Sequence, residues 1–158
     1  MAQTSYPTSQ PESVAGLVFG LNPTTVISRA AEAAIEFGRA VVQGTDKETQ
    51  AIQPSATGQV LLGVSIAVQK SRDIAAGTSA NYAATESVGI VTEGQIYVEV
   101  DQTVSPGDAV FFRHTGAAAD IGKFRLDADT AKADQITNAR WIKGAAAGGI
   151  AVLEISLP

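Results

Sequence analysis

The sequence predicts an all-β single domain, either a β-sandwich or a β-barrel, with little helix and an extended N-terminal arm. A jelly roll is one arrangement of this class. Two observations support the prediction. Within several short segments, apolar residues recur at every second position, and Gly, Pro and Asp residues typical of turns separate these segments. We expect the arm to comprise residues 1–13 and the β domain residues 14–158. A domain of about 150 residues buries enough surface to fold without a disulfide or metal, and this chain has no cysteine.

The arm is predicted from composition. Residues 1–13 are rich in Ser, Thr and Gln and contain Pro7 and Pro11. Proline lacks a backbone N–H and excludes both a helix interior and a central strand. We therefore expect this segment to be extended.

The segment that begins at Asn22 fits two structures. Asn22 and Pro23 have the residue types that start a helix, but four β-branched residues follow at 24–27. We expect a short strand near residues 26–29, then one or two turns of irregular or helical chain. A second short strand is expected at residues 37–43.

Alternation is strongest in two later segments. In residues 95–101, Ile96, Val98 and Val100 fall on one face and polar residues on the other, as in a half-buried antiparallel strand. In the other segment, five apolar side chains share one face of a predicted strand: Val60, Leu62, Val64, Ile66 and Val68.

The remaining chain consists of predicted turns and strands. Pro106 and Gly107 suit the two central positions of a type II turn. Four further strands are predicted at residues 109–113, 121–126, 139–143 and 150–157. The apolar loop at residues 144–149 is expected to pack against the core of the domain or against a neighbouring molecule.

Residue patterns typical of catalysis or cofactor binding are missing, so we predict no enzyme activity and no cofactor. The single histidine, His114, has no second histidine to form a metal pair, and we expect it at the surface or in a turn. Trp141 is expected in the core, with an interface role as the alternative. Four acidic residues are expected in solvated turns, with a cation site as the alternative: Asp120, Asp127, Asp129 and Asp134.

Charge and hydropathy limit the classes of partner. The net charge is −5 and no Lys/Arg-rich run occurs, which argues against nucleic acid. No apolar stretch approaches the roughly 20 residues of a membrane span, and the N-terminus has no signal-peptide pattern. We therefore expect synthesis in the cytoplasm. Charged residues make up only 17% of the chain, which favours a surface partly covered by other proteins.

Several elements in a fixed order resemble the structural cement, or head-decoration, proteins of tailed bacteriophages. These elements are "FGRAV" near the start, "VSPGDAV" in mid-chain, then "GKFR", "ARW" and a Gly-Ala segment that leads into a hydrophobic strand. The resemblance covers residues 14–157. It implies a virion protein on the outer capsid surface that binds the major capsid protein, bridges neighbouring subunits and stabilises the expanded shell. It also implies self-association as a dimer or trimer.

The arm and the apolar loop are the segments that we expect to contact neighbouring subunits. The arm has the composition of a chain that adds to another sheet edge, and the loop has small apolar side chains suited to close contact. The candidate contact residues are Ser5, Tyr6, Pro7, Pro11, Ala145, Ala146 and Ala147.

Two other functions stay open at this point. The first is another virion β-module, either a tail or baseplate component or a binder of host-surface glycans, which would bind cells or glycans in place of capsids. The second is an enzyme subunit or a trimeric β-fold hydrolase, which bound metal in purified protein would favour.

Overall fold

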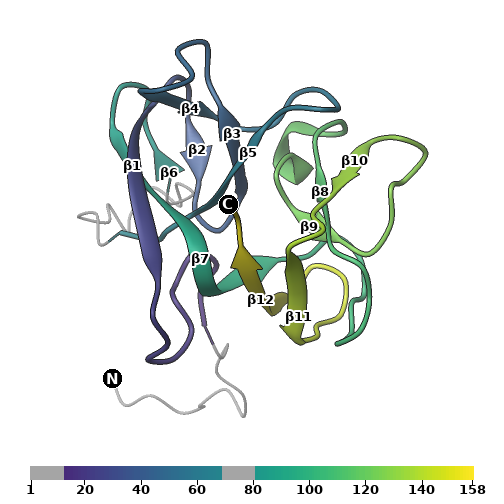
Figure 1. The fold of residues 1–158 in the computed structure, drawn as a ribbon. Helices are drawn as coiled ribbons and strands as arrows, with labels where there is room; N and C mark the ends of the chain where they lie inside the picture. The colour runs from purple at the N-terminus through teal and green to yellow at the C-terminus, as the bar shows by residue number, and fades with distance from the viewer. Residues whose placement is uncertain (1–12, 69–80) are drawn as a thin grey trace, which may run out of the picture.

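The computed structural model describes residues 13–68 and 81–158, and most of its strands belong to one sheet (Figure 1). The strands of this sheet are β1 (Thr25–Ala31), β3 (Ala40–Gln43), β4 (Gln50–Ile52), β5 (Leu61–Ser65), β7 (Ser87–Glu99), β11 (Ala139–Lys143) and β12 (Ile150–Ser156). Their order is β1-β4-β3-β5-β7-β12-β11, and β1 also pairs with β7. The first five strands in this order therefore close into a ring. Of the two predicted architectures, the protein has the barrel-like one.

Two small sheets complete the fold. A three-stranded sheet contains β10 (Ala133–Gln135), β8 (Phe111–Arg113) and β9 (Phe124–Arg125), and a two-stranded sheet contains β2 (Ile35–Glu36) and β6 (Asn81–Tyr82). Within the described ranges, the helical structure is a single 3₁₀ turn, η1 (Ala118–Asp120). The prediction of an all-β fold with little helix is confirmed.

The long strand β7 joins the ring to the C-terminal hairpin. Its first half pairs with β1, from Ser87 to Glu93, and its second half pairs with β12, from Glu93 to Glu99. The predicted alternation holds in the second half, where Ile96 and Val98 have no exposed surface. One strand therefore fixes the position of the hairpin β11–β12 relative to the barrel.

Buried residues form two clusters, one on each side of β3. Ala40, Val41 and Val42 are consecutive and all have 0% exposure. Val41 belongs to the cluster inside the ring, together with Ile35. Ala40 and Val42 belong to the larger cluster between the ring and the C-terminal strands. Because both faces of β3 are buried, its sequence is a continuous apolar run rather than an alternation.

The prediction that the apolar residues of 60–68 share one face is wrong. Leu62 packs inside the ring, whereas Val64 and Ile66 pack against the outer cluster. The pairing of β3 with β5 shifts register between Val41 and Val42. An extra residue at such a β-bulge reverses the faces of the residues beyond it. The two ends of the segment, Val60 and Val68, are 58% and 37% exposed.

Other local predictions have mixed outcomes. The strand expected near residues 26–29 lies within β1, and the chain after it is irregular. The strand expected at 37–43 begins only at Ala40, because Gly38, with φ of +68°, forms a turn. The turn at Pro106 and Gly107 is confirmed: Gly107 has φ of +102°, and the backbone N–H of Asp108 donates to the carbonyl of Ser105 at 3.1 Å.

Candidate functional site

An exposed apolar surface lies along one edge of β7. Seven large hydrophobic side chains are exposed in the described part of the chain, and six of them come from the N-terminal segment, β1 and the residues after β5. We call this set the apolar surface, and it comprises Val14, Leu17, Val18, Leu21, Val26 and Val68. The seventh, Val60, lies outside this set. Exposed apolar side chains that come from neighbouring segments are candidates for a protein–protein contact.

Backbone hydrogen bonds fix the N-terminal part of this surface. The N–H of Gly16 donates to the carbonyl of Tyr97 at 2.7 Å, and the N–H of Tyr97 donates to the carbonyl of Leu17 at 2.9 Å. Phe19 continues the pairing, since its N–H donates to Gln95 at 2.8 Å and its ring packs edge-to-face on Tyr97. The exposed side chains are therefore presented by an ordered backbone.

The segment after β5 connects the two ends of the apolar surface. The N–H of Ala67 donates to the carbonyl of Gly16 at 2.7 Å, and the N–H of Ile66 donates to Gly89 at 2.9 Å. A Cβ at Gly89 would lie 3.7 Å from Val26 and still closer to Ile66. These contacts place Val26 and the N-terminal segment on the two sides of residues 66–68.

Sequence reasoning did not identify this surface. The run "GLVFGL" at residues 16–21 carries three of its members and was assigned to no strand. The sequence feature that indicates it is the apolar run of residues 17–19 between Gly16 and Gly20, which belongs to none of the predicted strands. Exposure of these side chains could be recognised only from the fold.

The apolar loop packs partly on its own domain. Ala145 forms two backbone hydrogen bonds with Val104, at 3.0 and 3.1 Å, and packs against the outer cluster. Ala146 and Ala147 are exposed, although the N–H of Ala147 donates to the hydroxyl of Thr103 at 3.3 Å. The contact of this loop with a neighbouring molecule stays a prediction.

The four candidate contact residues of the arm lie outside the described residues, and their role stays a prediction: Ser5, Tyr6, Pro7 and Pro11. The described chain begins at Ser13, next to Val14 of the apolar surface. The arm and this surface are therefore adjacent along the chain.

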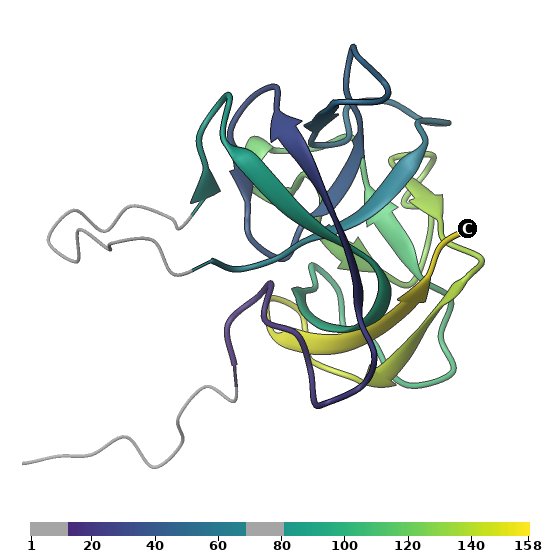
Figure 2. The same cartoon turned by 60° about the vertical axis from the view of Figure 1, so that its left-hand side comes forward.

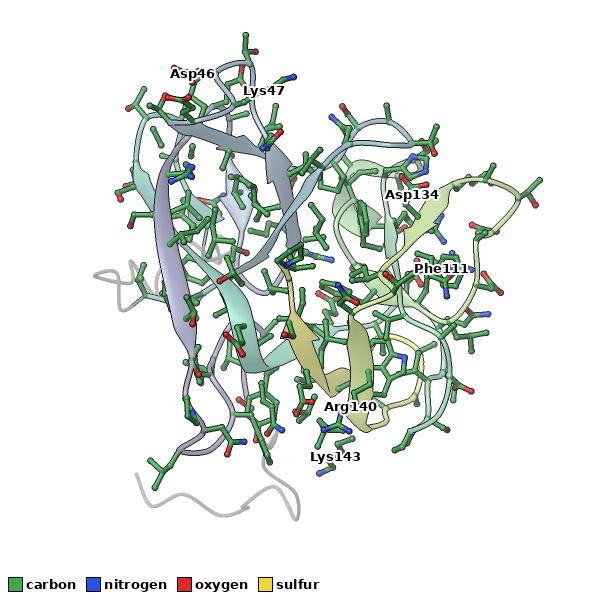
Figure 3. All side chains as sticks on the ribbon, in the orientation of Figure 1. Asp46, Lys47, Phe111, Asp134, Arg140 and Lys143 are labelled. Atoms are coloured by element: carbon green, nitrogen blue, oxygen red, sulfur yellow. The ribbon has the colours of Figure 1, made fainter. Side chains whose placement is uncertain are left out.

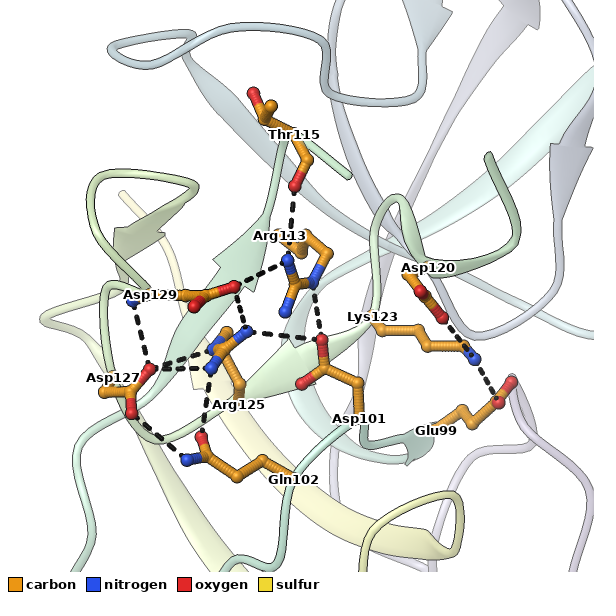
Figure 4. Close-up of polar contacts among 10 residues, drawn as sticks. All are labelled: Glu99, Asp101, Gln102, Arg113, Thr115, Asp120, Lys123, Arg125, Asp127 and Asp129. Atoms are coloured by element: carbon orange, nitrogen blue, oxygen red, sulfur yellow. Dashed lines mark hydrogen bonds and ion pairs between the residues drawn. The ribbon is translucent and has the colours of Figure 1, made fainter. Parts of the chain in front are cut away.

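Three of the acidic residues pair with cations on β8, on β9 and beside β9 (Figure 4). Asp129 lies 2.8 Å from Arg113 and 3.0 Å from Arg125, and Asp127 lies 2.8 Å from Arg125. Asp101, beyond the end of β7, also binds Arg113 at 2.5 Å. Burial alone would lower the pKa of Arg113, but hydrogen bonds and charge from Asp101 and Asp129 raise it. These three carboxylates are thus paired with two guanidinium groups.

A second ion-paired group holds β9 to β7. The ammonium of Lys123 lies 2.8 Å from Glu99 and 3.0 Å from Asp120. Glu99 also pairs with Arg39 at 3.2 Å. Burial alone would lower the pKa of Lys123, but its bonds to Glu99 and Asp120 and the charge of Glu99 raise it. In residues 13–68 and 81–158, no group of three His, Cys, Asp or Glu side chains is placed to hold a metal ion.

His114 directly follows β8, and its exposed fraction is 3%, so the surface alternative of the prediction is wrong. Its Nδ1 lies 2.9 Å from the hydroxyl of Thr115, and its Nε2 lies 3.6 Å from Asp134. Asp134 in turn accepts hydrogen bonds from the Thr57 hydroxyl at 2.8 Å and the Gly58 N–H at 2.7 Å. The pair therefore links β8 and β10 to the loop before β5.

The core position expected for Trp141 is confirmed, with 3% exposure and a hydrogen bond from its indole N–H to the carbonyl of Ala109 at 3.2 Å. No described helix is long and apolar enough to cross a membrane. The described residues thus present ion pairs that join strands, together with an apolar surface whose side chains are 37% to 104% exposed.

Comparisons with known proteins agree with this picture. A family model described as "Structural cement protein (E217 gp24/Pam3 gp6)" matches residues 2–156. A search of curated proteins returns no match. Among solved structures, a chain from "The capsid of Myoviridae Phage XM1" has a TM-score of 0.80 at 13% identity, with 98% of this chain and 97% of that chain covered. At this identity, the structural match establishes the fold. The family match extends over nearly the whole sequence, and the chain therefore belongs to the phage structural cement protein family.

Proposed function

We propose that the protein decorates the outer surface of an icosahedral phage head, bridges neighbouring major capsid subunits and stabilises the expanded shell. Membership of the cement family supports a structural role in the virion. The observation that carries the proposal is the apolar surface, which an ordered backbone presents on one edge of the barrel. A capsid subunit that covers this surface removes it from water, and this burial favours binding.

The arm and the loop 144–149 extend the same contact in this proposal. The arm leaves the described chain beside Val14, and the loop exposes Ala146 and Ala147. Each contact can be weak, because a shell presents many copies and linked contacts multiply the affinity. The protein acts by binding, without a catalytic step. Its location is the virion surface after synthesis in the host cytoplasm.

Binding to capsids tests this function directly. Purified protein is mixed with expanded heads that lack it, and the heads are sedimented and imaged. We expect saturable density at symmetry-related outer sites, and heads that withstand higher temperature than undecorated ones. Protein that stays in the supernatant at saturating concentration, and is folded by circular dichroism, would contradict the proposal and direct attention to glycans or tail components.

A further inference from the structure

A continuous groove crosses the molecule on the C-terminal strands. Three hollows, of about 510, 590 and 410 Å³, share lining residues with one another. Thr137 and Asn138 line both the first and the second hollow, and Glu154 and Ser156 line both the second and the third. The groove therefore extends from the C-terminal residue Pro158, across β11 and β12, to the loop before β1.

The walls of the groove are mostly polar, and the charged side chains among them are Glu93, Asp134, Glu154 and Arg140. Glu154 is the central acid, and both of its oxygens are bonded: one accepts from Arg140 at 2.7 Å and the other from Gln95 at 2.6 Å. Asp134, on β10, accepts two hydrogen bonds from residues 57 and 58. Side chains with uncharged hydroxyl or amide groups make up much of the remaining wall, including Thr57, Gln59, Gln135, Thr137, Asn138 and Ser156.

Apolar side chains are also present in the first hollow. Leu61, Phe112, Ile136 and Leu157 line it, and Phe112 and Ile136 are almost fully buried. Such a hollow suits an occupant with uncharged polar groups and a few proline or aromatic rings. Phe112 is the only aromatic residue among those that line the three hollows, and it is 2% exposed. The groove therefore offers no exposed ring on which a sugar could stack.

The arm has the matching composition. Residues 1–11 contain no charged side chain, and they comprise Met, Ala, Tyr6, two prolines, and six Gln, Ser or Thr residues. An extended segment of 12 residues spans at most about 40 Å. Proline-containing extended segments also lose little conformational entropy on binding, because the proline φ angle is already fixed.

The described chain starts near one end of the groove, since the N–H of Phe19 donates to the carbonyl of Gln95, which lines the third hollow. In Figure 2, the purple segment at the start of the described chain lies on the opposite side of the molecule from the C-terminus. The C-terminal residue Pro158 lines the groove. We propose that the arm of one copy occupies the groove of a second copy, so that arms and grooves join copies into a closed assembly. This inference uses the arm of the proposed function but concerns contacts between copies rather than contacts with the capsid.

Full-length variants test the exchange of arms. One variant blocks the groove with Ser156→Trp, an exposed position shared by two hollows, and Thr137→Trp serves as a second, independent block. Another variant keeps the length of the arm but replaces residues 3–10 with Gly and Ser. The matched control is Lys47→Trp, an exposed residue on a distant loop (Figure 3). Thermal unfolding verifies that each variant is folded.

Analytical ultracentrifugation measures association of each variant alone and in pairs. We expect the parent chain and Lys47→Trp to associate, and the groove-blocked and arm-replaced variants each to associate at least tenfold more weakly. A mixture of these two defective variants is expected to recover a complex, because one contributes an arm and the other a groove. A synthetic peptide of residues 1–12 is expected to compete with association of the parent chain.

Four results would overturn the inference: a parent chain that stays monomeric, groove-blocked variants that associate like the parent, a mixture that does not recover a complex, or glycan binding that the groove block abolishes while association is unchanged. Capsid sedimentation separates the two proposals. A groove-blocked variant that still decorates heads leaves the proposed function intact whatever its association. A parent chain that associates but never decorates heads contradicts the proposed function alone.

Discussion

At the scale of single residues, the buried polar groups show how tertiary packing changes the role of a side chain. His114 follows a predicted strand, where a surface or turn position is expected, but it is buried beside Asp134. Ser65 is also fully buried, and its hydroxyl donates to the carbonyl of Glu36 at 2.7 Å and accepts from the N–H of Arg39 at 3.1 Å. One hydroxyl thus satisfies two backbone groups that the fold removes from water.

Substitution Ser65→Ala is expected to destabilise the protein by about 1–3 kcal/mol, because a buried carbonyl and a buried N–H lose their partner. Urea denaturation at neutral pH measures the change. Ser87→Ala is the matched control, since Ser87 is exposed and its hydroxyl lies 3.5 Å from Ser28. We expect its effect to stay within about 0.5 kcal/mol. Equal effects of the two substitutions would show that the Ser65 hydrogen bonds contribute no special stability.

The raised pKa of Lys123 predicts a dependence of stability on alkaline pH. A folded-state pKa above the ordinary value of 10.5 means that the stabilisation is complete below that value and is lost as the pH rises through the folded-state pKa. In Lys123→Met, the free energy of unfolding should therefore decrease less between pH 10 and 12 than in the parent chain. Urea denaturation across this range measures the difference. The control Lys47→Met should follow the parent curve, and a Lys123→Met curve parallel to the parent's would disprove the assignment.

At the scale of elements, the bulge between β3 and β5 decides which side chains enter the ring. Gly63 lies at this bulge with φ of +148°. A Cβ there would collide with the backbone carbonyl of Val91, so close approach of β5 to β7 requires glycine. The faces of residues 60–68 reverse at this bulge, where Leu62 is the extra residue between Leu61 and Gly63.

Gly63→Ala is expected to cost about 3 kcal/mol or more, since it adds a backbone collision to an unfavourable φ. Gly107→Ala tests the φ contribution alone: Gly107 has φ of +102°, and nothing lies within 4 Å of a Cβ there. We expect a cost of about 1–2 kcal/mol at that position. Chemical denaturation measures both variants. A Gly63→Ala variant that is no less stable than Gly107→Ala would mean that β5 shifts away from β7 at little cost.

At the scale of the whole molecule, the N-terminal segment, β1 and the residues after β5 together form the surface proposed for capsid binding. Leu17→Asp places a charge at the centre of the N-terminal segment, where Leu17 is 43% exposed. A charge buried against an apolar partner is costly, so we expect capsid affinity to fall at least about tenfold, or ~1.4 kcal/mol.

Val60→Asp is the matched control, because Val60 is 58% exposed but lies outside the apolar surface. Both variants should keep the thermal stability of the parent chain, since both side chains already contact water. Sedimentation with expanded heads at several protein concentrations gives the affinities. If Val60→Asp weakens decoration as much as Leu17→Asp does, the apolar surface is not the specific contact.

Several features of this protein could be predicted from the sequence because they depend on neighbours along the chain. The alternation of apolar and polar residues around Ile96 and Val98 indicates a half-buried strand. Pro106 and Gly107 indicate a turn, because these two residue types favour the φ angles that the turn requires. The order of short motifs also sufficed to identify the family, and the match to residues 2–156 confirms it.

Features that depend on contacts between distant segments required the tertiary structure. The pairing of β1 with β7 closes the ring, and the bulge at Gly63 divides residues 60–68 between two cores. Burial of His114 and exposure of Leu17 likewise follow from which strands lie beside them. The sequence by itself determined the all-β class, the turns and the family. Only the tertiary structure decided the closure of the barrel, the two cores and the exposed surface, because local periodicity contains no information about which strands become neighbours.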